Sequence, residues 1–178
     1  DAAKVGNADV LTAAAEQLKT LRQEQAQALL ANMRVEKDEV RGMAFYYPQN
    51  FPNYIDTRCY VLPYIGQEGD NVWLRLLCDY TEDDWVFFEQ ITFAVDDERY
   101  YKYYNYFDVV RDNDYGVVWE YVDTEVSDSD VEMLWAIANS TQTIVRFEGD
   151  EYYYDFTVSQ GDKDAIREVL TAYEALQG

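Results

Sequence analysis

The sequence predicts an α+β fold in which an antiparallel β-sheet packs against an N-terminal helix, a short internal helix and a C-terminal helix. Three observations predict it. Residues 1–41 contain no aromatic side chain, and the apolar residues within them recur at helical spacing. From Val40 onward the apolar residues alternate with a period of two, as strands require. The chain then ends in a helix, a hairpin and a second helix.

The N-terminal segment is predicted to form one helix over residues 7–33, with a narrow and alanine-rich apolar stripe. Gln25 interrupts the leucine heptad of this stripe, so the pattern gives poor support for a coiled coil. We interpret residues 1–33 as a spacer or docking helix that contributes little to the core. Residues 34–178 are expected to form a single α+β domain.

Strands are predicted wherever tyrosine and β-branched residues alternate between turn signals. They cover residues 42–47, 58–65, 71–80, 85–95, 99–107 and 117–122. A hairpin follows, in which Gly149 and Asp150 form a two-residue loop of the glycine-first kind that is typical of a type II′ turn. In this register Val145 faces Tyr154 and Phe147 faces Tyr152, while Arg146 and Asp155 lie on the other face of the hairpin.

Two helices flank this hairpin. Ser127 begins a capping-box pattern that predicts a short helix ending near Asn139. Ser159 is predicted to cap the final helix, because an apolar stripe follows it at helical spacing. That stripe consists of Ile166, Val169, Leu170, Tyr173 and Leu176.

The chain is strongly acidic, with 35 Asp and Glu residues against 14 Lys and Arg and a net charge of −21. Such a surface repels phosphate backbones and anionic headgroups, so we expect no nucleic-acid partner. No apolar run approaches the ~18 residues that a transmembrane segment needs. Because the chain starts at Asp1 without a charged and apolar leader, we expect any signal segment or lipid anchor to lie upstream of it.

No histidine is present. Its absence excludes Ser-His-Asp and Cys-His nucleophile activation and the His-containing zinc sites. What remains is a pair of carboxylates, which glycosidases hold ~5–10 Å apart. The clustered acids are Glu82 to Asp84, Asp96 to Glu98, Asp128 with Asp130, and Asp150 with Glu151. Each cluster lies at a predicted turn or helix start, where acids are common for local reasons, so we expect no catalytic residue.

Residues 112–116 resemble the start of a calcium loop, because oxygen-bearing side chains alternate along them. An EF-hand needs glycine at its sixth position, where this chain has Val117, and usually a glutamate at the twelfth, where it has Asp123. We therefore interpret the segment as a turn between strands and expect neither a metal site nor a cofactor.

The run from Tyr100 to Phe107 is the most unusual segment. In a strand it would place Tyr101 and Tyr103 on one face and Tyr100, with Lys102 and Tyr104, on the other. Tyrosine suits sugar stacking and protein interfaces alike, so Tyr101, Tyr103 and Tyr153 are the candidate ligand-binding residues. The alternative is a strand with one face in the core. We expect at least one of Tyr101 and Tyr103 to be buried there.

Cys59 and Cys78 are the two cysteines of the chain. A hairpin centred on Glu68-Gly69 would place them directly opposite each other. A non-hydrogen-bonded antiparallel pair brings Cα atoms to about 4.5 Å, within the range of a disulfide, and this bond would suit an exported protein. A one-residue slip in the hairpin loop would destroy the alignment, and buried free thiols are the alternative.

Over about residues 33–175 the chain resembles an uncharacterised domain of exported lipoproteins of Gram-positive anaerobic bacteria. The segments that carry the resemblance are Tyr64-Ile-Gly66, Trp73-Leu-Arg-Leu76 with Asp84-Trp85, Arg111-Asp-Asn113 with Trp119-Glu120, and Arg146-Phe-Glu-Gly-Asp-Glu-Tyr-Tyr153. The resemblance implies an extracytoplasmic location and no assigned activity.

Together these patterns lead us to expect a non-enzymatic extracytoplasmic module with a binding, interaction or structural role at the bacterial cell surface. Its partner would be an unidentified protein or glycan of the cell envelope. Two alternatives stay open: a carbohydrate-binding surface built from the exposed tyrosines, and a histidine-free hydrolase that uses an Asp/Glu pair.

Overall fold

The computed structural model describes the backbone of residues 2–177 and the side chains of residues 7–177. Across that range the predicted α+β class is confirmed. The helices are α1 (Ala2–Leu30), α2 (Asp128–Asn139) and α3 (Gln160–Gln177), with short 3-10 helices η1 (Ile55–Thr57) and η2 (Tyr106–Asp108). The strands are β1 (Arg34–Asp38), β2 (Met43–Tyr47), β3 (Tyr60–Glu68), β4 (Asn71–Glu82), β5 (Gln90–Val95), β6 (Glu98–Tyr103), β7 (Val110–Asp114), β8 (Val117–Glu125), β9 (Thr143–Glu148) and β10 (Tyr153–Thr157).

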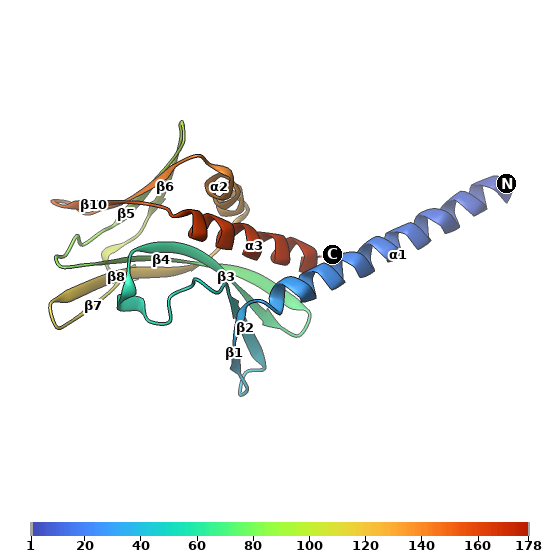
Figure 1. Ribbon diagram of the computed structural model, residues 1–178, viewed down its shortest axis with the longest axis horizontal. Coiled ribbons are helices and arrows are strands. Elements are labelled where there is room, and N and C mark those ends of the chain that lie inside the picture. Colours follow the sequence, from blue (N-terminus) through green and yellow to red (C-terminus); the bar gives the residue numbers. More distant parts are fainter. Residues whose placement is uncertain (1, 178) are drawn as a thin grey trace.

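The strands form two antiparallel sheets, where the sequence had suggested one. The six-stranded sheet has the order β1-β2-β3-β4-β8-β7, and the four-stranded sheet has the order β10-β9-β5-β6. Figure 1 shows the two sheets side by side at one end of the molecule, with α3 running along β3 and β4 towards the other end. The rings of Tyr80 and Phe147, one from each sheet, lie 5.9 Å apart, so the inner faces meet in a shared core.

Helix α1 projects from the body of the protein (Figure 1). Residues 7–25 are exposed, whereas Ala26, Leu30 and Met33 are buried against the body. The expectation that this helix contributes little to the core therefore holds for its long exposed part and is wrong for its last turn and the residues that follow. None of the helices in the described range is both long and apolar enough to span a membrane.

The predicted helix caps are confirmed. The Ser127 hydroxyl accepts the N–H of Asp130 and the Asp130 carboxylate accepts the N–H of Ser127, which is the reciprocal pattern of a capping box. The Ser159 hydroxyl accepts the N–H of Asp162 at the start of α3. These bonds satisfy amides that would otherwise lack an intrahelical partner.

The sequence missed β1 and β7, which form the two edges of the six-stranded sheet. Both are rich in charged residues because an edge strand has a solvated side and little to bury. Two predicted strands were too long: β5 starts at Gln90 rather than residue 85, and β6 ends at Tyr103 rather than residue 107. Residues 85–89, which were predicted to belong to β5, instead cross from the six-stranded sheet to the four-stranded sheet.

The register of the β9–β10 hairpin differs from the prediction by two residues. Phe147 lies opposite Tyr154 and Val145 opposite Phe156, so the loop has four residues rather than two. Gly149 does not supply the positive φ of a type II′ turn. It is needed because a Cβ there would lie 2.2 Å from the carbonyl oxygen of Val86. A shift of two residues keeps every side chain on its face, so Arg146 and Asp155 share the outer side as predicted.

The predicted cysteine alignment is wrong. In the β3–β4 hairpin Cys78 lies opposite Val61, because the turn is formed by Gly69 and Asp70 rather than by Glu68 and Gly69. Both cysteines are free thiols in the structure. Burial raises the pKa of each thiol to about 12, so both are expected to be protonated and unreactive at neutral pH.

The loop of residues 48–59 covers part of the outer face of the six-stranded sheet. Phe51 packs edge-on against Tyr60 and Tyr64, with ring centroids 5.4 and 5.9 Å apart. The Thr81 hydroxyl oxygen of β4 lies 3.1 Å from the carbonyl oxygen of Ile55 in the same loop. Tyr60 and Tyr64 of this face are therefore core residues.

Candidate functional site

The outer face of the four-stranded sheet carries the tyrosines that the sequence singled out. Two neighbouring rows of directly opposed residues cross this face from β6 to β10. The first row is Tyr101, Thr92, Arg146 and Asp155, and the second is Tyr103, Gln90, Glu148 and Tyr153. The sheet therefore brings all three candidate residues to one face, with two tyrosines on one edge strand and the third on the other.

These three tyrosines are exposed: 53% of Tyr101, 71% of Tyr103 and 60% of Tyr153 is accessible to solvent. The expectation that Tyr101 or Tyr103 would be buried in the core is wrong. The alternate residues of β6 point inward instead, and the Lys102 ammonium lies 2.6 Å from the Asp130 carboxylate of α2. That ion pair keeps the register of β6 such that its odd-numbered tyrosines face water.

The centre of the outer face is hollowed to about 400 Å³. Its lining residues come from all four strands, and they are Gln90, Thr92, Ala94, Arg99, Tyr101, Ile144, Arg146, Glu148 and Asp155. The Gln90 amide donates to the Thr92 hydroxyl at 3.0 Å and to the Glu148 carboxylate at 3.4 Å. The short side chains of Thr92 and Ala94 on β5 leave this space between the longer side chains around them.

Arg146 is held in place on this face from two sides. It donates two hydrogen bonds to Asp155, at 2.7 and 2.8 Å, and its guanidinium lies 4.1 Å from the centre of the Tyr153 ring. Hydrogen bonds from Arg146 lower the pKa of Asp155 below its usual range, so the pair stays ionised. A planar, oriented guanidinium loses little freedom when it binds a further acceptor.

Such a face offers flat apolar rings at both edges and fixed hydrogen-bonding groups between them. The rings of Tyr101 and Tyr153 can stack on an apolar surface of a ligand, while an amide, a hydroxyl and a charged pair lie between them. This arrangement can bind a ligand whose surface alternates C–H patches and hydroxyl groups.

One acidic cluster serves the local role that the sequence suggested, since Asp130 caps α2, whereas Asp96 binds amides that are distant in the sequence. The Asp96 carboxylate accepts the N–H groups of Thr141 and Gln142 at 3.0 and 2.9 Å, and these bonds lower its pKa. Asp130 caps α2 and pairs with Lys102. Within the described residues no group of three or more Asp, Glu or Cys side chains could hold a metal ion. The predicted turn between strands is confirmed for Tyr115 and Gly116, whereas residues 112–114 belong to strand β7 and pair with β8.

One carboxyl has the raised pKa that a hydrolase would use. Burial raises the pKa of Asp79 to about 8, although the hydroxyl of Thr81 donates to it at 2.7 Å and opposes the shift. Its other oxygen has no hydrogen-bond partner in the structure. Asp79 is 0% exposed and belongs to the covered face beneath the loop of residues 48–59, so substrate cannot reach it without unfolding that loop.

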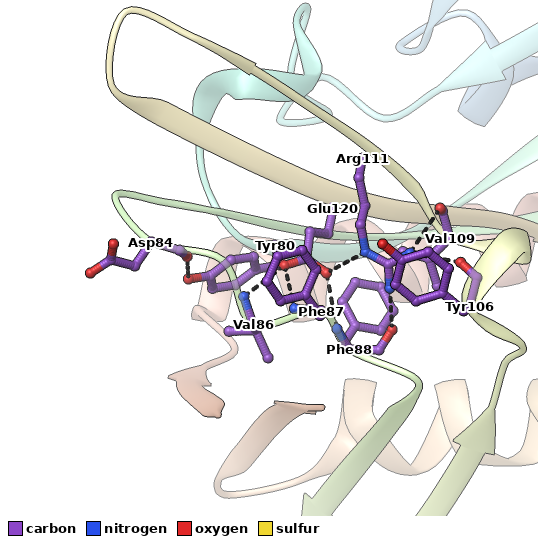
Figure 2. A network of polar contacts seen from close by, with 9 residues as sticks. All are labelled: Tyr80, Asp84, Val86, Phe87, Phe88, Tyr106, Val109, Arg111 and Glu120. Carbon is purple, nitrogen blue, oxygen red and sulfur yellow. Dashed lines mark hydrogen bonds and ion pairs between the residues drawn. The ribbon is translucent and has the colours of Figure 1, made fainter. Parts of the chain in front are cut away.

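A network of polar contacts surrounds the buried Glu120 and was not predicted from the sequence (Figure 2). The carboxylate accepts the consecutive N–H groups of Val86, Phe87 and Phe88 at 2.7 to 2.9 Å, and Arg111 pairs with it at 3.1 Å. Residues 111 and 120 lie directly opposite each other in β7 and β8. The sequence contained a signal of this buried acid, because Glu120 interrupts the apolar side of β8 between Val118 and Val122.

Comparison with known proteins gives no relative for this chain: no family model, no curated protein and no solved structure matches it. The resemblance to an exported domain therefore rests on the residues named above.

Proposed function

We propose that this chain is a non-enzymatic binding module of a bacterial cell-surface protein, and that the outer face of the four-stranded sheet is its binding surface. The observation that carries the proposal is the exposure of Tyr101 and Tyr103 together with Tyr153 on one uncovered sheet face. Exposed aromatic residues that gather on one face are uncommon on a surface with no partner. The extracytoplasmic location rests on the resemblance alone.

An oligosaccharide is the ligand class that we favour for this face. A pyranose ring presents C–H patches that stack on tyrosine and hydroxyl groups that bind planar amide, carboxylate and guanidinium groups. The hollow supplies Gln90, Glu148 and Arg146 as such groups, and about 400 Å³ lies within the usual range of small-ligand sites. A protein partner would more often need a wider surface with an apolar centre, and the centre of this face is polar.

A glycan array followed by calorimetry on the best ligand tests this proposal. We expect Tyr101→Ala and Tyr103→Ala each to weaken binding by about tenfold, since stacking on an aromatic ring contributes roughly 1 kcal/mol or more. Arg146→Gln should also weaken binding, because it removes the oriented guanidinium.

The control is Tyr115→Ala, which removes a still more exposed tyrosine from the β7–β8 turn. If Tyr115→Ala weakens binding as much as Tyr103→Ala does, or if no envelope glycan binds, the outer face is not a carbohydrate site. Capture of one envelope protein that Tyr103→Ala abolishes would keep the binding face and replace the ligand class.

A hydrolase is the second candidate, supported only by the raised pKa of Asp79. Its burial beneath the loop of residues 48–59 argues for a structural role. The measurement that separates the two is hydrolysis of the arrayed glycans: turnover lost in Asp79→Asn but kept in Tyr101→Ala would favour the enzyme.

A further inference from the structure

A second hollow, of about 290 Å³, lies where the crossing segment before β5 meets the β9–β10 turn. We call it the Phe87 hollow. Its lining residues are Val86, Phe87, Glu89, Tyr106, Asp150, Glu151 and Tyr152. None of them belongs to the two rows of the outer face, so the hollow is a separate site from the proposed binding surface.

The walls of the Phe87 hollow are held by the Glu120 network (Figure 2). Phe87 has a φ of 55°, which a residue with a bulky side chain rarely adopts. That conformation turns the N–H groups of Val86, Phe87 and Phe88 towards one carboxylate, as in the concave backbone sites that bind anions. The strain is therefore balanced by Glu120, and the Phe87 ring is fixed at the surface of the protein.

The opposite wall is equally fixed. Gly149 lets the β9–β10 turn approach the backbone of Val86 and Phe87, because any side chain there would collide with their carbonyl oxygens. The N–H of Gly149 donates to the carbonyl oxygen of Tyr152 at 2.9 Å and closes the turn. A site with both walls fixed loses little freedom when a ligand enters.

The charges of the lining residues are all negative. Glu89, Asp150 and Glu151 are exposed at the hollow, and no Lys or Arg lines it. The Arg111 guanidinium lies over two of the lining rings, 4.1 Å from the centre of the Tyr106 ring and 5.9 Å from that of the Phe87 ring. Its charge is balanced by Glu120 at 3.1 Å, so the three surface acids set the potential that a ligand meets.

We propose that the Phe87 hollow binds an organic ammonium group. Aromatic rings attract such cations through their faces, and the rings of Phe87, Tyr106 and Tyr152 line the hollow together with three carboxylates. Trp85 stacks on Phe87, and Arg111 lies over Phe87 and Tyr106, so within the described residues Tyr152 is the ring without an aromatic or cationic partner on its face. A hydrated metal ion would make no apolar contact with the rings, whereas the methyl or methylene groups of an alkylammonium would pack against them. The volume of about 290 Å³ suits a small headgroup or the end of a lysine side chain rather than a large ligand.

The test is an NMR titration of the whole chain with tetramethylammonium, with butylammonium, and with the neutral 3,3-dimethyl-1-butanol, all at one ionic strength. We expect saturable shifts of the amides of residues 86–89 and 150–152 with at least one ammonium and none with the neutral alcohol. A preference for tetramethylammonium would indicate a quaternary amine as the natural ligand, and a preference for butylammonium would indicate a lysine side chain.

Charge removal and ring removal then separate specific binding from general attraction to an acidic protein. We expect Glu89→Gln combined with Glu151→Gln, and separately Tyr152→Ala, to weaken ammonium binding by about tenfold. The matched control, Glu39→Gln with Asp97→Asn, removes the same charge from two turns outside the hollow.

Equal weakening by the control pair would show that only net charge matters, and would overturn the proposal. Equal binding of the neutral alcohol, or no saturable shift at residues 86–89, would overturn it as well. Loss of glycan binding in these variants is not expected, so failure here and failure of the outer face can be told apart.

Discussion

Both sheets carry tyrosines on their outer faces, but a loop covers one of these faces and the other is exposed to solvent. On the six-stranded sheet Tyr60 is 1% exposed, because the loop of residues 48–59 lies over it with Phe51 packed on the ring. On the four-stranded sheet no described segment lies over Tyr101 and Tyr103, and both face water. The difference shows that a tyrosine on a strand is neither a core nor a surface signal by itself. The segment that passes over the strand decides.

The carboxyls of the two faces differ in the same way. Asp79 on the covered face has a raised pKa, because burial penalises its charged form. Asp155 on the open face has a lowered pKa, because Arg146 donates hydrogen bonds to its charged form. Covering a face thus changes both the stability that its rings contribute and the charge that its acids carry.

The largest expected effect is on the covered face. Tyr60→Ala removes a ring that is fully enclosed by the sheet and by Phe51, and large-to-small changes of this kind cost roughly 3–5 kcal/mol. We expect Tm to fall by about 10 °C, given roughly 2–4 °C per kcal/mol at this chain length. Differential scanning calorimetry checks it. A fall as small as that of an exposed tyrosine would mean that the loop does not cover this face in solution.

A smaller effect, for each pH unit, is expected from the titration of Asp79. The pKa of Asp79 is about 8 in the folded protein and near 4 in the unfolded chain, so the folded state holds a proton that the unfolded state loses. This group therefore favours folding fully below about pH 4, and its contribution is lost as pH rises towards 8, by at most about 1.4 kcal/mol per pH unit.

Urea unfolding of the native chain and Asp79→Asn at several pH values isolates this contribution from that of the other carboxyls. The stability of Asp79→Asn relative to the native chain should increase between pH 4 and 8. A constant difference would show that Asp79 is ionised in the folded protein and that the covered face admits water.

The smallest expected effect is on the open face. Tyr101→Ala and Tyr103→Ala should each change the free energy of unfolding by no more than about 0.5 kcal/mol, as is usual for exposed positions. The same calorimetry checks it, beside Tyr60→Ala as the contrasting variant. A loss near that of Tyr60→Ala would place these rings against another part of the protein and remove the proposed binding face.

Much of the fold could be predicted from local patterns, and the failures have identifiable physical causes. Ser127 and Ser159 predicted their helix starts because capping is a local interaction. The hairpin register predicted from Gly149 was wrong, because this glycine is needed for a close approach to Val86, which is distant in the sequence. Likewise, Glu120 captures amides that lie more than thirty residues before it, and no local pattern reports such a contact.

The residues of the candidate site were predicted from the sequence, but the exposure of both Tyr101 and Tyr103 was not. Alternation along β6 placed Tyr101 and Tyr103 on one face, which the structure confirms. Whether that face would be covered depended on the path of the loops, and a loop path follows from packing of the whole chain. The inward Lys102 was the available hint, since a lysine on the inner side needs a buried acid such as Asp130.

The length of the exposed part of α1 determines how far its N-terminal end lies from the body of the protein. Residues 7–25 carry the helix about 27 Å away from the body, at 1.5 Å per residue. Charges in physiological salt are screened over about 8 Å. An anionic surface that held the far end of this helix would thus lie more than three screening lengths from the acidic body. At that distance the screened repulsion between the acidic body and such a surface would be small.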